Sequence, residues 1–139
     1  PEIVERLQRV LEASSLQNEQ IWIISFSSDV IEAVEKRMPE KQTCWIVKLK
    51  NDKTQETMQR DVLFETARRI KTDGLDLCAQ PDIVDEDLVQ AMNKLQLKLF
   101  VWTVNDVKLA RSMQQLGCDG ITTDKPGWLR NELNISTRP

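Results

Sequence analysis

Five short apolar runs recur along the chain at nearly regular intervals, and this spacing constrains the fold more than any other feature of the sequence. The runs begin near residues 21, 44, 75, 98 and 120, so successive starts lie 23, 31, 23 and 22 residues apart. They are near-continuously apolar, which is typical of strands covered on both faces. The predicted strands are Ile21–Ile24, Cys44–Val47, Leu75–Ala79, Lys98–Val104 and Gly120–Thr122.

The segments between these runs have the spacing of amphipathic helices. In Ile3–Leu11 and Val107–Leu116, for example, apolar side chains recur every three or four residues. Side chains that accept hydrogen bonds stand where several of these segments begin. The predicted helix-boundary residues are Ser27 or Ser28, Asp85, Asn105 or Asp106, and Asp124 as N-caps, Pro126 in a first turn, and Gly117 as a left-handed C-cap.

Alternating strands and helices predict an α/β protein built from parallel βα repeats with right-handed crossovers. We expect one leading helix and then five strand–helix units, forming a single domain over residues 1–139 with about five strands and six helices. An open doubly wound sheet and a partial (β/α)8 TIM barrel both fit this order. Only four glycines are present and none forms a phosphate loop after a strand, which weakens the nucleotide-binding form of the open sheet.

Composition excludes several function classes. The chain contains no histidine, so no mechanism in it uses imidazole as an acid, a base or a metal ligand. The formal net charge of −3 argues against binding nucleic acid through a broad basic surface, and no apolar run is long enough to span a membrane. The three cysteines, Cys44, Cys78 and Cys118, show no CxxC spacing and are predicted to be buried free thiols.

The start of the sequence shows no recognisable targeting signal. The chain begins at Pro1, and nothing near it has the apolar core of a signal peptide. We expect that processing or truncation removed the original start. A leading helix without a strand before it fits a barrel cut just after its third strand. The sequence does not indicate a compartment.

Parallel βα folds place their working site at the carboxyl ends of the strands. Several polar residues there have both a structural and a functional interpretation. Ser27 and Asp124 can cap helices, and Trp102 can line a pocket or fill the barrel. Other candidates are Lys48 and Lys50, at a solvated strand end, and the acidic cluster Asp82, Asp85, Glu86 and Asp87, which a helix dipole explains without a metal. Spacing alone identifies no catalytic residue and no metal ligand.

Two motifs near the end of the chain carry a resemblance to a known family. Phe100–Asp106 reads FVWTVND, and Leu116–Pro126 reads LGCDGITTDKP. The chain resembles the glycerophosphodiester phosphodiesterases, which combine a "WTVN" strand end with a "GxDGIxTDxP" segment about 20 residues later. Ile23–Ser27 is similar to the family's "SF" strand, and Met38-Pro39 to the end of the helix that follows it. The resemblance extends from Pro1 to about Leu133.

The resemblance implies a (β/α)8 barrel of lipid and glycerol metabolism that hydrolyses glycerophosphodiesters to an alcohol and glycerol 3-phosphate. It also implies a divalent metal, Mg²⁺ or Ca²⁺, held by carboxylates, and a pair of histidines. The family carries those motifs in the first half of the barrel, whereas this chain corresponds to strands four to eight. We therefore expect a carboxyl-terminal fragment of the phosphodiesterase, inactive as an isolated chain. A non-catalytic half-barrel acting as an interaction or self-assembling module is the alternative, so enzyme status stays open.

The resemblance can be carried over at only a few positions. Trp102 matches the tryptophan that lines the family's substrate pocket, and Ser25 and Phe26 match the "SF" strand end beside it. Asn105 and Asp124 match motif letters and are interpreted as loop and cap positions. The chain departs from the family in Leu95–Leu97, where a glycine is usual.

A half-barrel also predicts how the chain associates. Five of eight strands leave two open sheet edges, here Ile21–Ile24 and Gly120–Thr122, and an inner apolar face that a complete barrel buries. The expected partners are a glycerophosphodiester in the complete barrel and either the missing amino-terminal half or a second copy of the chain. Ile21–Ile24 is the favoured seam because it is longer and lacks glycine.

Overall fold

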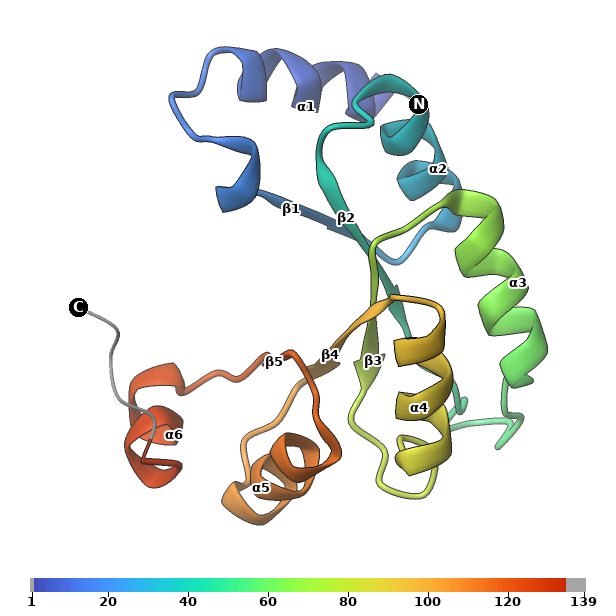
Figure 1. Cartoon of the computed structure of the whole chain (residues 1–139), viewed down its shortest axis with the longest axis vertical. Coiled ribbons are helices and arrows are strands. Elements are labelled where there is room, and N and C mark those ends of the chain that lie inside the picture. The colour runs from blue at the N-terminus through green and yellow to red at the C-terminus, as the bar shows by residue number, and fades with distance from the viewer. Residues whose placement is uncertain (1, 135–139) are drawn as a thin grey trace. The chain divides into compact units, whose positions relative to one another are not determined.

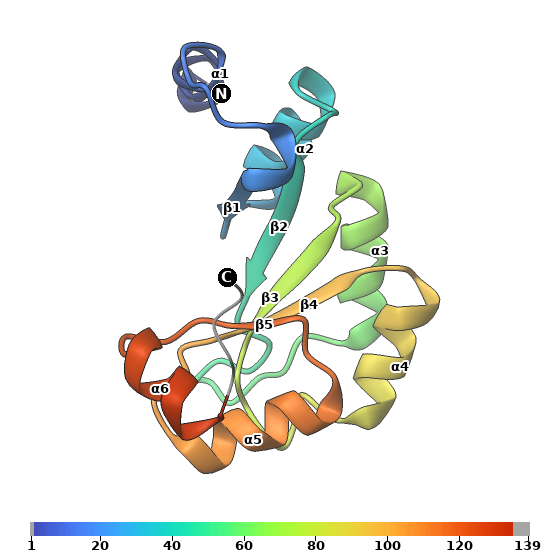
Figure 2. The same ribbon diagram turned by 60° about the vertical axis from the view of Figure 1, so that its left-hand side comes forward.

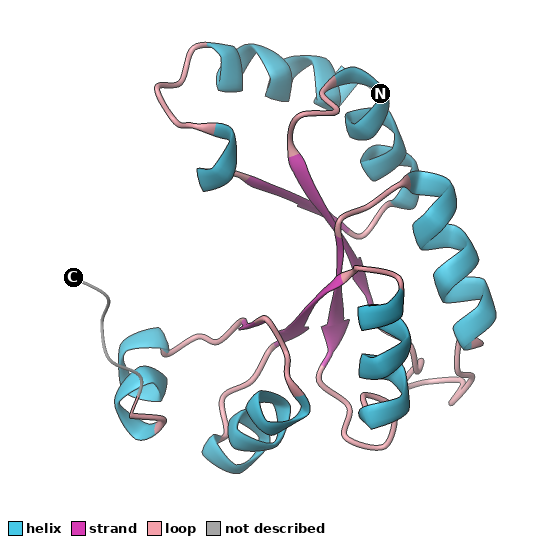
Figure 3. Ribbon diagram, viewed as in Figure 1, coloured by secondary structure: helices cyan, strands magenta, loops and turns pink. Residues whose placement is uncertain are grey.

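The computed structural model describes residues 2–134, and strands and helices alternate through them (Figures 1 and 3). A short 3₁₀ helix, η1 (Asn18–Gln20), precedes the first strand. The strands are β1 (Trp22–Ser25), β2 (Gln42–Val47), β3 (Gly74–Cys78), β4 (Lys98–Trp102) and β5 (Gly120–Ile121). The helices are α1 (Glu2–Glu12), α2 (Ser28–Arg37), α3 (Arg60–Ile70), α4 (Glu86–Lys94), α5 (Val107–Leu116) and α6 (Pro126–Glu132).

The strands form one sheet in the order β1-β2-β3-β4-β5. The pairs β1–β2 and β4–β5 are parallel, with Trp22 opposite Gln42 and Phe100 opposite Gly120. This confirms the predicted α/β class and the partial (β/α)8 barrel. The chain divides into two compact units, Pro1–Leu75 and Asp76–Pro139, each of which is described by itself below. The single-domain assignment stays a prediction.

The strand boundaries differ from the predicted ones by a few residues. Ile21 closes η1 by donating its backbone N–H to Asn18 O (3.1 Å), so β1 begins at Trp22. β4 ends at Trp102 and β5 at Ile121, short of the predicted Val104 and Thr122. Backbone hydrogen bonds still join the two segments there, since Thr122 N donates to Val101 O and Val104 N donates to Thr122 O, both at 2.8 Å.

The first unit is held together by an apolar cluster between α1, α2 and β1. Its buried members are Val4, Ile21, Ile23, Val34 and Met38. On the surface above this cluster, Arg37 donates to Gln8 Oε1 (2.7 Å) and to Glu5 Oε1 (3.1 Å), which ties α2 to α1.

In the second unit, one face of the strands is buried against helices. Leu77 on β3 and Leu99 and Val101 on β4 are almost fully buried, and α4 contacts β4. Because side chains alternate along a strand, Phe100 and Trp102 lie on the opposite face, where both are half-buried. α5 and α6 lie side by side in both views, and Arg111 joins them by donating to Glu132 O (3.1 Å; Figures 1 and 2).

Most of the predicted helix boundaries are confirmed. The side chains of Ser27, Asp85 and Asp106 accept hydrogen bonds from Val30 N, Leu88 N and Leu109 N at 3.3, 2.9 and 2.8 Å. Gly117 ends α5 with a φ of +90°, and Pro126 stands at the start of α6. The prediction that Asp124 caps α6 is wrong. Lys125 occupies the N-cap position, and the Asp124 carboxylate accepts from Asn105 Nδ2 instead.

Two turns depend on how much space or freedom the backbone has. A side chain at Gly120 would come within 2.7 Å of Phe100 Cδ1, so glycine lets the Phe100 ring lie against β5. At Leu95–Leu97, where the sequence departs from the family that it resembles, Gln96 adopts a φ of +57°. That is the left-handed conformation that glycine takes without cost, so the turn is kept although the glycine is absent.

An aspartate just before a strand fixes the register of its neighbour, and this device occurs twice. Before β3, Asp73 accepts from Thr43 N through its carboxylate (2.8 Å) and donates its own N–H to Thr43 O (3.2 Å). Before β5, Asp119 makes the same pair of bonds with Leu99, at 2.9 and 2.7 Å. Thr43 and Leu99 are each the second residue of their strand. We call these two pairs the aspartate clamps.

We predict that replacing Asp73 by alanine lowers the free energy of unfolding by about 1–3 kcal/mol, because Thr43 is fully buried and its N–H loses its acceptor. Denaturant unfolding of the 139-residue chain measures this loss. Asp73→Asn keeps an acceptor oxygen and is expected to lose less. A change below about 0.5 kcal/mol for Asp73→Ala would contradict the importance of the clamp.

Candidate functional site

The two family motifs meet through the side chain of Asn105. Its amide Nδ2 donates to Asp124 Oδ2 (2.6 Å), and its Oδ1 accepts from Thr123 Oγ1 (2.9 Å) and from Asp124 N (3.0 Å). Asn105 follows the carboxyl end of β4, and Thr123 and Asp124 follow that of β5. One amide therefore uses both its ends to hold the loop after β5 against the loop after β4.

The start of α6 continues this polar rim. Thr123 Oγ1 accepts from Lys125 N (3.2 Å), so the Thr123 hydroxyl takes part in both loops. The Lys125 ammonium lies 5.9 Å from the ring centre of Trp128, an exposed indole. Asp124 and Asn105 are thus a bonded pair, which the sequence did not predict because each residue alone fits a loop or a cap.

Trp102, the predicted pocket residue, is half-buried at the carboxyl end of β4. Its indole Nε1 donates to Asp76 O (3.0 Å), a backbone carbonyl of β3. The backbones of the two strands also meet here, since Ala79 N donates to Trp102 O (2.8 Å). The indole is therefore anchored by its polar end to the neighbouring strand.

Asp76 is a buried carboxyl beside this indole. The residue is only 7% exposed, and its Oδ1 is the one enclosed side-chain oxygen without a hydrogen-bond partner among residues 2–134. Burial raises the pKa of Asp76 from 3.8 to about 6. Sequence reasoning missed this residue, although a signal was present: an aspartate interrupts the apolar run Gly74–Cys78.

We predict that Asp76 makes stability fall as the pH rises from about 4 to about 6. The unfolded carboxyl ionises near pH 3.8 and the folded one near pH 6, so the folded state loses up to about 3 kcal/mol across this window and does not recover it above. Asp76→Asn should remove this loss and be the more stable protein at pH 8.

Thermal unfolding of both proteins between pH 4 and 8 checks this prediction. Asp82→Asn is the matched control, because Asp82 is exposed and its replacement removes the same charge. If Asp76→Asn and Asp82→Asn show the same dependence of stability on pH as the parent, Asp76 is not the cause of the loss of stability.

Ser25 and Phe26, the other predicted substrate-binding residues, lie in the first unit at the end of β1. Ser25 Oγ accepts from Ser27 N (3.0 Å), and Phe26 O accepts from Trp45 Nε1 (3.1 Å). The Phe26 side chain is 65% exposed. These contacts describe a folded strand end with an outward aromatic ring, and the substrate-binding role of both residues stays a prediction.

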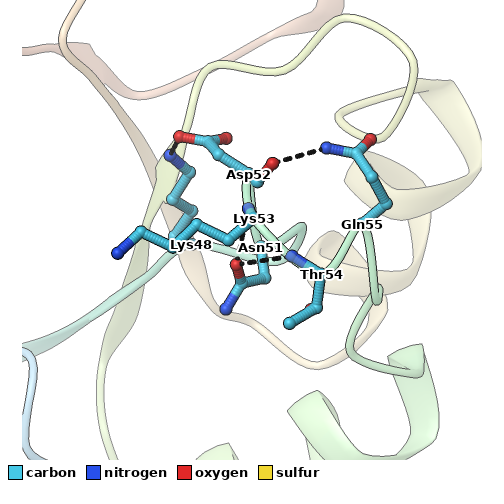
Figure 4. A network of polar contacts seen from close by, with 6 residues as sticks. All are labelled: Lys48, Asn51, Asp52, Lys53, Thr54 and Gln55. Atoms are coloured by element: carbon cyan, nitrogen blue, oxygen red, sulfur yellow. Dashed lines mark hydrogen bonds and ion pairs between the residues drawn. The ribbon is translucent and has the colours of Figure 1, made fainter.

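The lysines after β2 belong to a loop that is closed by its own side chains (Figure 4). Lys48 forms an ion pair with Asp52, and Lys50 forms an antiparallel bridge with Thr57. Asn51 Oδ1 accepts from the backbone N–H groups of Lys53 (2.9 Å) and Thr54 (3.2 Å). The Lys48 charge is thereby neutralised within the loop, which favours the solvated interpretation over an anion site for that residue.

The described residues do not fit a complete metal site. Three members of the acidic cluster after β3 stabilise the start of α4. Asp85 is its N-cap, and Glu86 and Asp87 lie in its first turn, where the helix dipole favours negative charge. Within residues 2–134 no three carboxylate or thiol side chains gather around one point. Cys44 is buried and Cys78 and Cys118 are half-buried, and none of the three is in a disulfide bond. None of the helices described is long and apolar enough to cross a membrane.

Comparison with known proteins agrees with this fold. The profile of the glycerophosphoryl diester phosphodiesterase family matches residues 1–128. A Bacillus subtilis (strain 168) protein, YhdW, provisionally named a glycerophosphodiester phosphodiesterase, is 43% identical over 42 residues, which are 30% of this chain and 17% of YhdW.

Solved structures of the same family share the fold. A glycerophosphodiester phosphodiesterase from Parabacteroides distasonis superposes with a TM-score of 0.75 at 21% identity, over 96% of this chain and 50% of its own. A phosphodiesterase from Oleispira antarctica, solved with the product sn-glycerol-3-phosphate, gives a TM-score of 0.66 at 18% identity, over 81% of this chain and 41% of its own.

The fold and the rim thus define part of a (β/α)8 barrel with its loops at the carboxyl ends of the strands. The chain belongs to the glycerophosphoryl diester phosphodiesterase family. It spans half or less of the length of these relatives.

Proposed function

We propose that this chain supplies the carboxyl-terminal half of a metal-dependent barrel that hydrolyses glycerophosphodiesters to an alcohol and glycerol 3-phosphate. The observation that carries the proposal is the Asn105 amide, which joins both family motifs into one rim at 2.6–3.0 Å. The family match over residues 1–128 and the product complex of the Oleispira relative support it.

The residues of this chain fit binding and positioning. Trp102 would line the substrate pocket from the end of β4, with its indole oriented by the carbonyl of Asp76. Asn105 would hold the loop after β5 in place. Proton transfer by imidazole and the metal ligands would come from residues outside this sequence, because it contains no histidine and its described carboxylates form no ligand set. The identity of the metal, Mg²⁺ or Ca²⁺, is part of the proposal.

We predict that the isolated 139-residue chain has no phosphodiesterase activity, since it lacks the groups for acid–base work. Purified chain is incubated with glycerophosphocholine and glycerophosphoglycerol, with Mg²⁺ and with Ca²⁺, and glycerol 3-phosphate is measured. The heat-denatured chain is the control. Turnover above that control contradicts the proposal that the acid–base groups and the metal ligands come from residues outside this sequence.

The same assay tests the function itself when the chain is joined to an amino-terminal half-barrel carrying the histidine and carboxylate motifs. The reading frame that encodes this chain is the first source of such a half. Activity in the joined barrel, lost again when the upstream histidines are replaced, supports the phosphodiesterase. A joined barrel that folds but is inactive contradicts the proposed phosphodiesterase function.

We predict that Trp102→Ala in the joined barrel lowers kcat/KM by about tenfold, mainly through KM, because the indole contacts substrate rather than reacting. Trp102→Phe is the matched variant, which keeps an aromatic ring but loses the Nε1–H that anchors it. Circular dichroism and unfolding are measured alongside. Unchanged activity, or loss of the fold in both variants, would show that Trp102 only fills the barrel.

Exposed apolar surface favours the second candidate, a half-barrel that works by association. In the first unit, Ile24 on the edge strand β1 and Phe26 after it are 56% and 65% exposed. In the second unit, a cavity of about 300 Å³ lies beside the other edge strand, β5, and is lined in part by Ile121, Leu129 and Leu133. Unpaired strand edges next to apolar side chains are a common basis for pairing with another chain.

We predict that the isolated chain self-associates, with β1 as the seam. Sedimentation velocity across a concentration series should show a rising mean mass. Replacing Ile24 by lysine should lower it, because a charge on an edge strand opposes pairing. Val62→Lys is the matched control, since Val62 is similarly exposed but lies on helix α3. A folded monomer at every concentration would contradict the prediction.

A further inference from the structure

The cavity of about 300 Å³ beside β5 lies on the helix side of the sheet in the second unit. Ile121, which lines it, is opposite Val101 in the parallel pair, so the two side chains share the face that is buried against helices. Phe100 and Trp102 lie on the other face, where the substrate pocket is proposed. The cavity is therefore separate from that pocket.

The walls of this cavity are largely apolar and are held in place. Ile121 forms one wall, and Leu129 and Leu133 form another. α5 and α6 lie side by side (Figures 1 and 2), and the hydrogen bond from Arg111 to Glu132 O, 3.1 Å long, ties them together. The hollow thus exists before any ligand arrives, as is usual for small-molecule sites.

The thiol of Cys118 also lines the cavity and adds to its apolar surface. Burial and the nearby charge of Asp119 raise the pKa of Cys118 to about 11. The thiol is therefore uncharged at neutral pH, and an uncharged thiol packs as a small apolar group.

Two charged side chains line the cavity, and they differ in whether their charge is paired. Asp119 forms an ion pair with Lys98 (2.8 Å) and accepts from Leu99 N (2.9 Å). Arg130 is exposed and takes part in no ion pair within residues 2–134. The cavity therefore combines apolar walls with one guanidinium that has no carboxylate partner.

We propose that this cavity binds an alkyl carboxylate, with the carboxylate on Arg130 and the alkyl chain against Ile121, Leu129 and Leu133. A guanidinium matches a carboxylate through two parallel N–H···O bonds. A singly charged carboxylate fits better than a doubly charged phosphate, because the Asp119 carboxylate lines the same cavity and repels negative charge.

The volume of the cavity sets the size of the ligand. A water molecule occupies about 30 Å³ in the liquid, so about 300 Å³ holds about ten non-hydrogen atoms, as in octanoate. Binding itself does not depend on the proposed function. Ester hydrolysis that frees a glycerophosphodiester from a glycerophospholipid also releases alkyl carboxylates, so the reaction class that supplies the proposed substrate supplies this class of ligand.

Binding of octanoate to the 139-residue chain tests the proposal. The methyl signals of Ile121, Leu129 and Leu133 are followed by NMR at pH 7.5 while sodium octanoate is added at constant ionic strength. We expect saturable shifts with a Kd of about 1 mM, the range for a ligand of about ten non-hydrogen atoms. Butanoate, with its shorter chain, and octylammonium, with the opposite charge, are each expected to bind at least about tenfold more weakly.

Arg130→Gln is the decisive variant, because it keeps a polar side chain and removes the charge. It should weaken octanoate binding about threefold to fivefold, the range of an exposed ion pair, and should not weaken octylammonium binding. Leu133→Asp, which places a carboxylate in the cavity, should remove the saturable shifts. Lys108→Gln is the matched control, since Lys108 is an exposed cation on α5 outside the cavity. Circular dichroism verifies the fold of each variant.

Four results would overturn the proposal. They are the absence of saturable shifts at these methyl groups, equal binding of octanoate and octylammonium, and equal octanoate binding by the parent and Arg130→Gln. The fourth is a Kd that rises with protein concentration, which would show that a second copy of the chain fills the cavity instead.

Discussion

The aspartate clamps are the interaction on which the rest of the structure depends. In a parallel sheet a shift of one residue moves every side chain to the other face. Asp73 and Asp119 prevent such a shift by bonding both backbone groups of Thr43 and Leu99 at the amino ends of the strands. Once the amino ends are aligned, the carboxyl ends are aligned as well, and the second clamp brings Asn105 within reach of Asp124.

Polar groups at the amino ends of the strands are satisfied, whereas one in the middle of β3 is not. At the amino ends the polar groups are satisfied: Thr43 Oγ1 donates to Glu35 Oε1 (2.6 Å), and the single hydroxyl proton of Thr72 is shared between the carbonyls of Thr43 and Gly74 (3.1 and 3.0 Å). Farther along β3, Asp76 keeps an enclosed oxygen without a partner. The polar groups named at the amino ends therefore have hydrogen-bond partners, whereas the middle of β3 carries a buried carboxyl oxygen that has none.

The sequence predicted those features that depend on local patterns. The strand–helix alternation, the caps at Ser27, Asp85 and Asp106, and the turn at Gly117 follow from spacing and from residue type. The family motifs pointed to the rim, but the Asn105–Asp124 bond joins residues 19 positions apart, and each of them has an ordinary local interpretation. Asp76 was missed because burial is set by the whole packed sheet, and a single aspartate within an apolar run carries no period.

The clamps also give the loops at the carboxyl ends freedom to vary. Each clamp closes a ring of chain, 30 residues from Thr43 to Asp73 and 20 from Leu99 to Asp119. Doubling the length of a flexible ring costs only about 0.6 kcal/mol in closure entropy, less than the two hydrogen bonds of a clamp contribute. Insertions in the loop at residues 48–58 can therefore accumulate without moving a strand, so that new ligand preferences can evolve on an unchanged sheet.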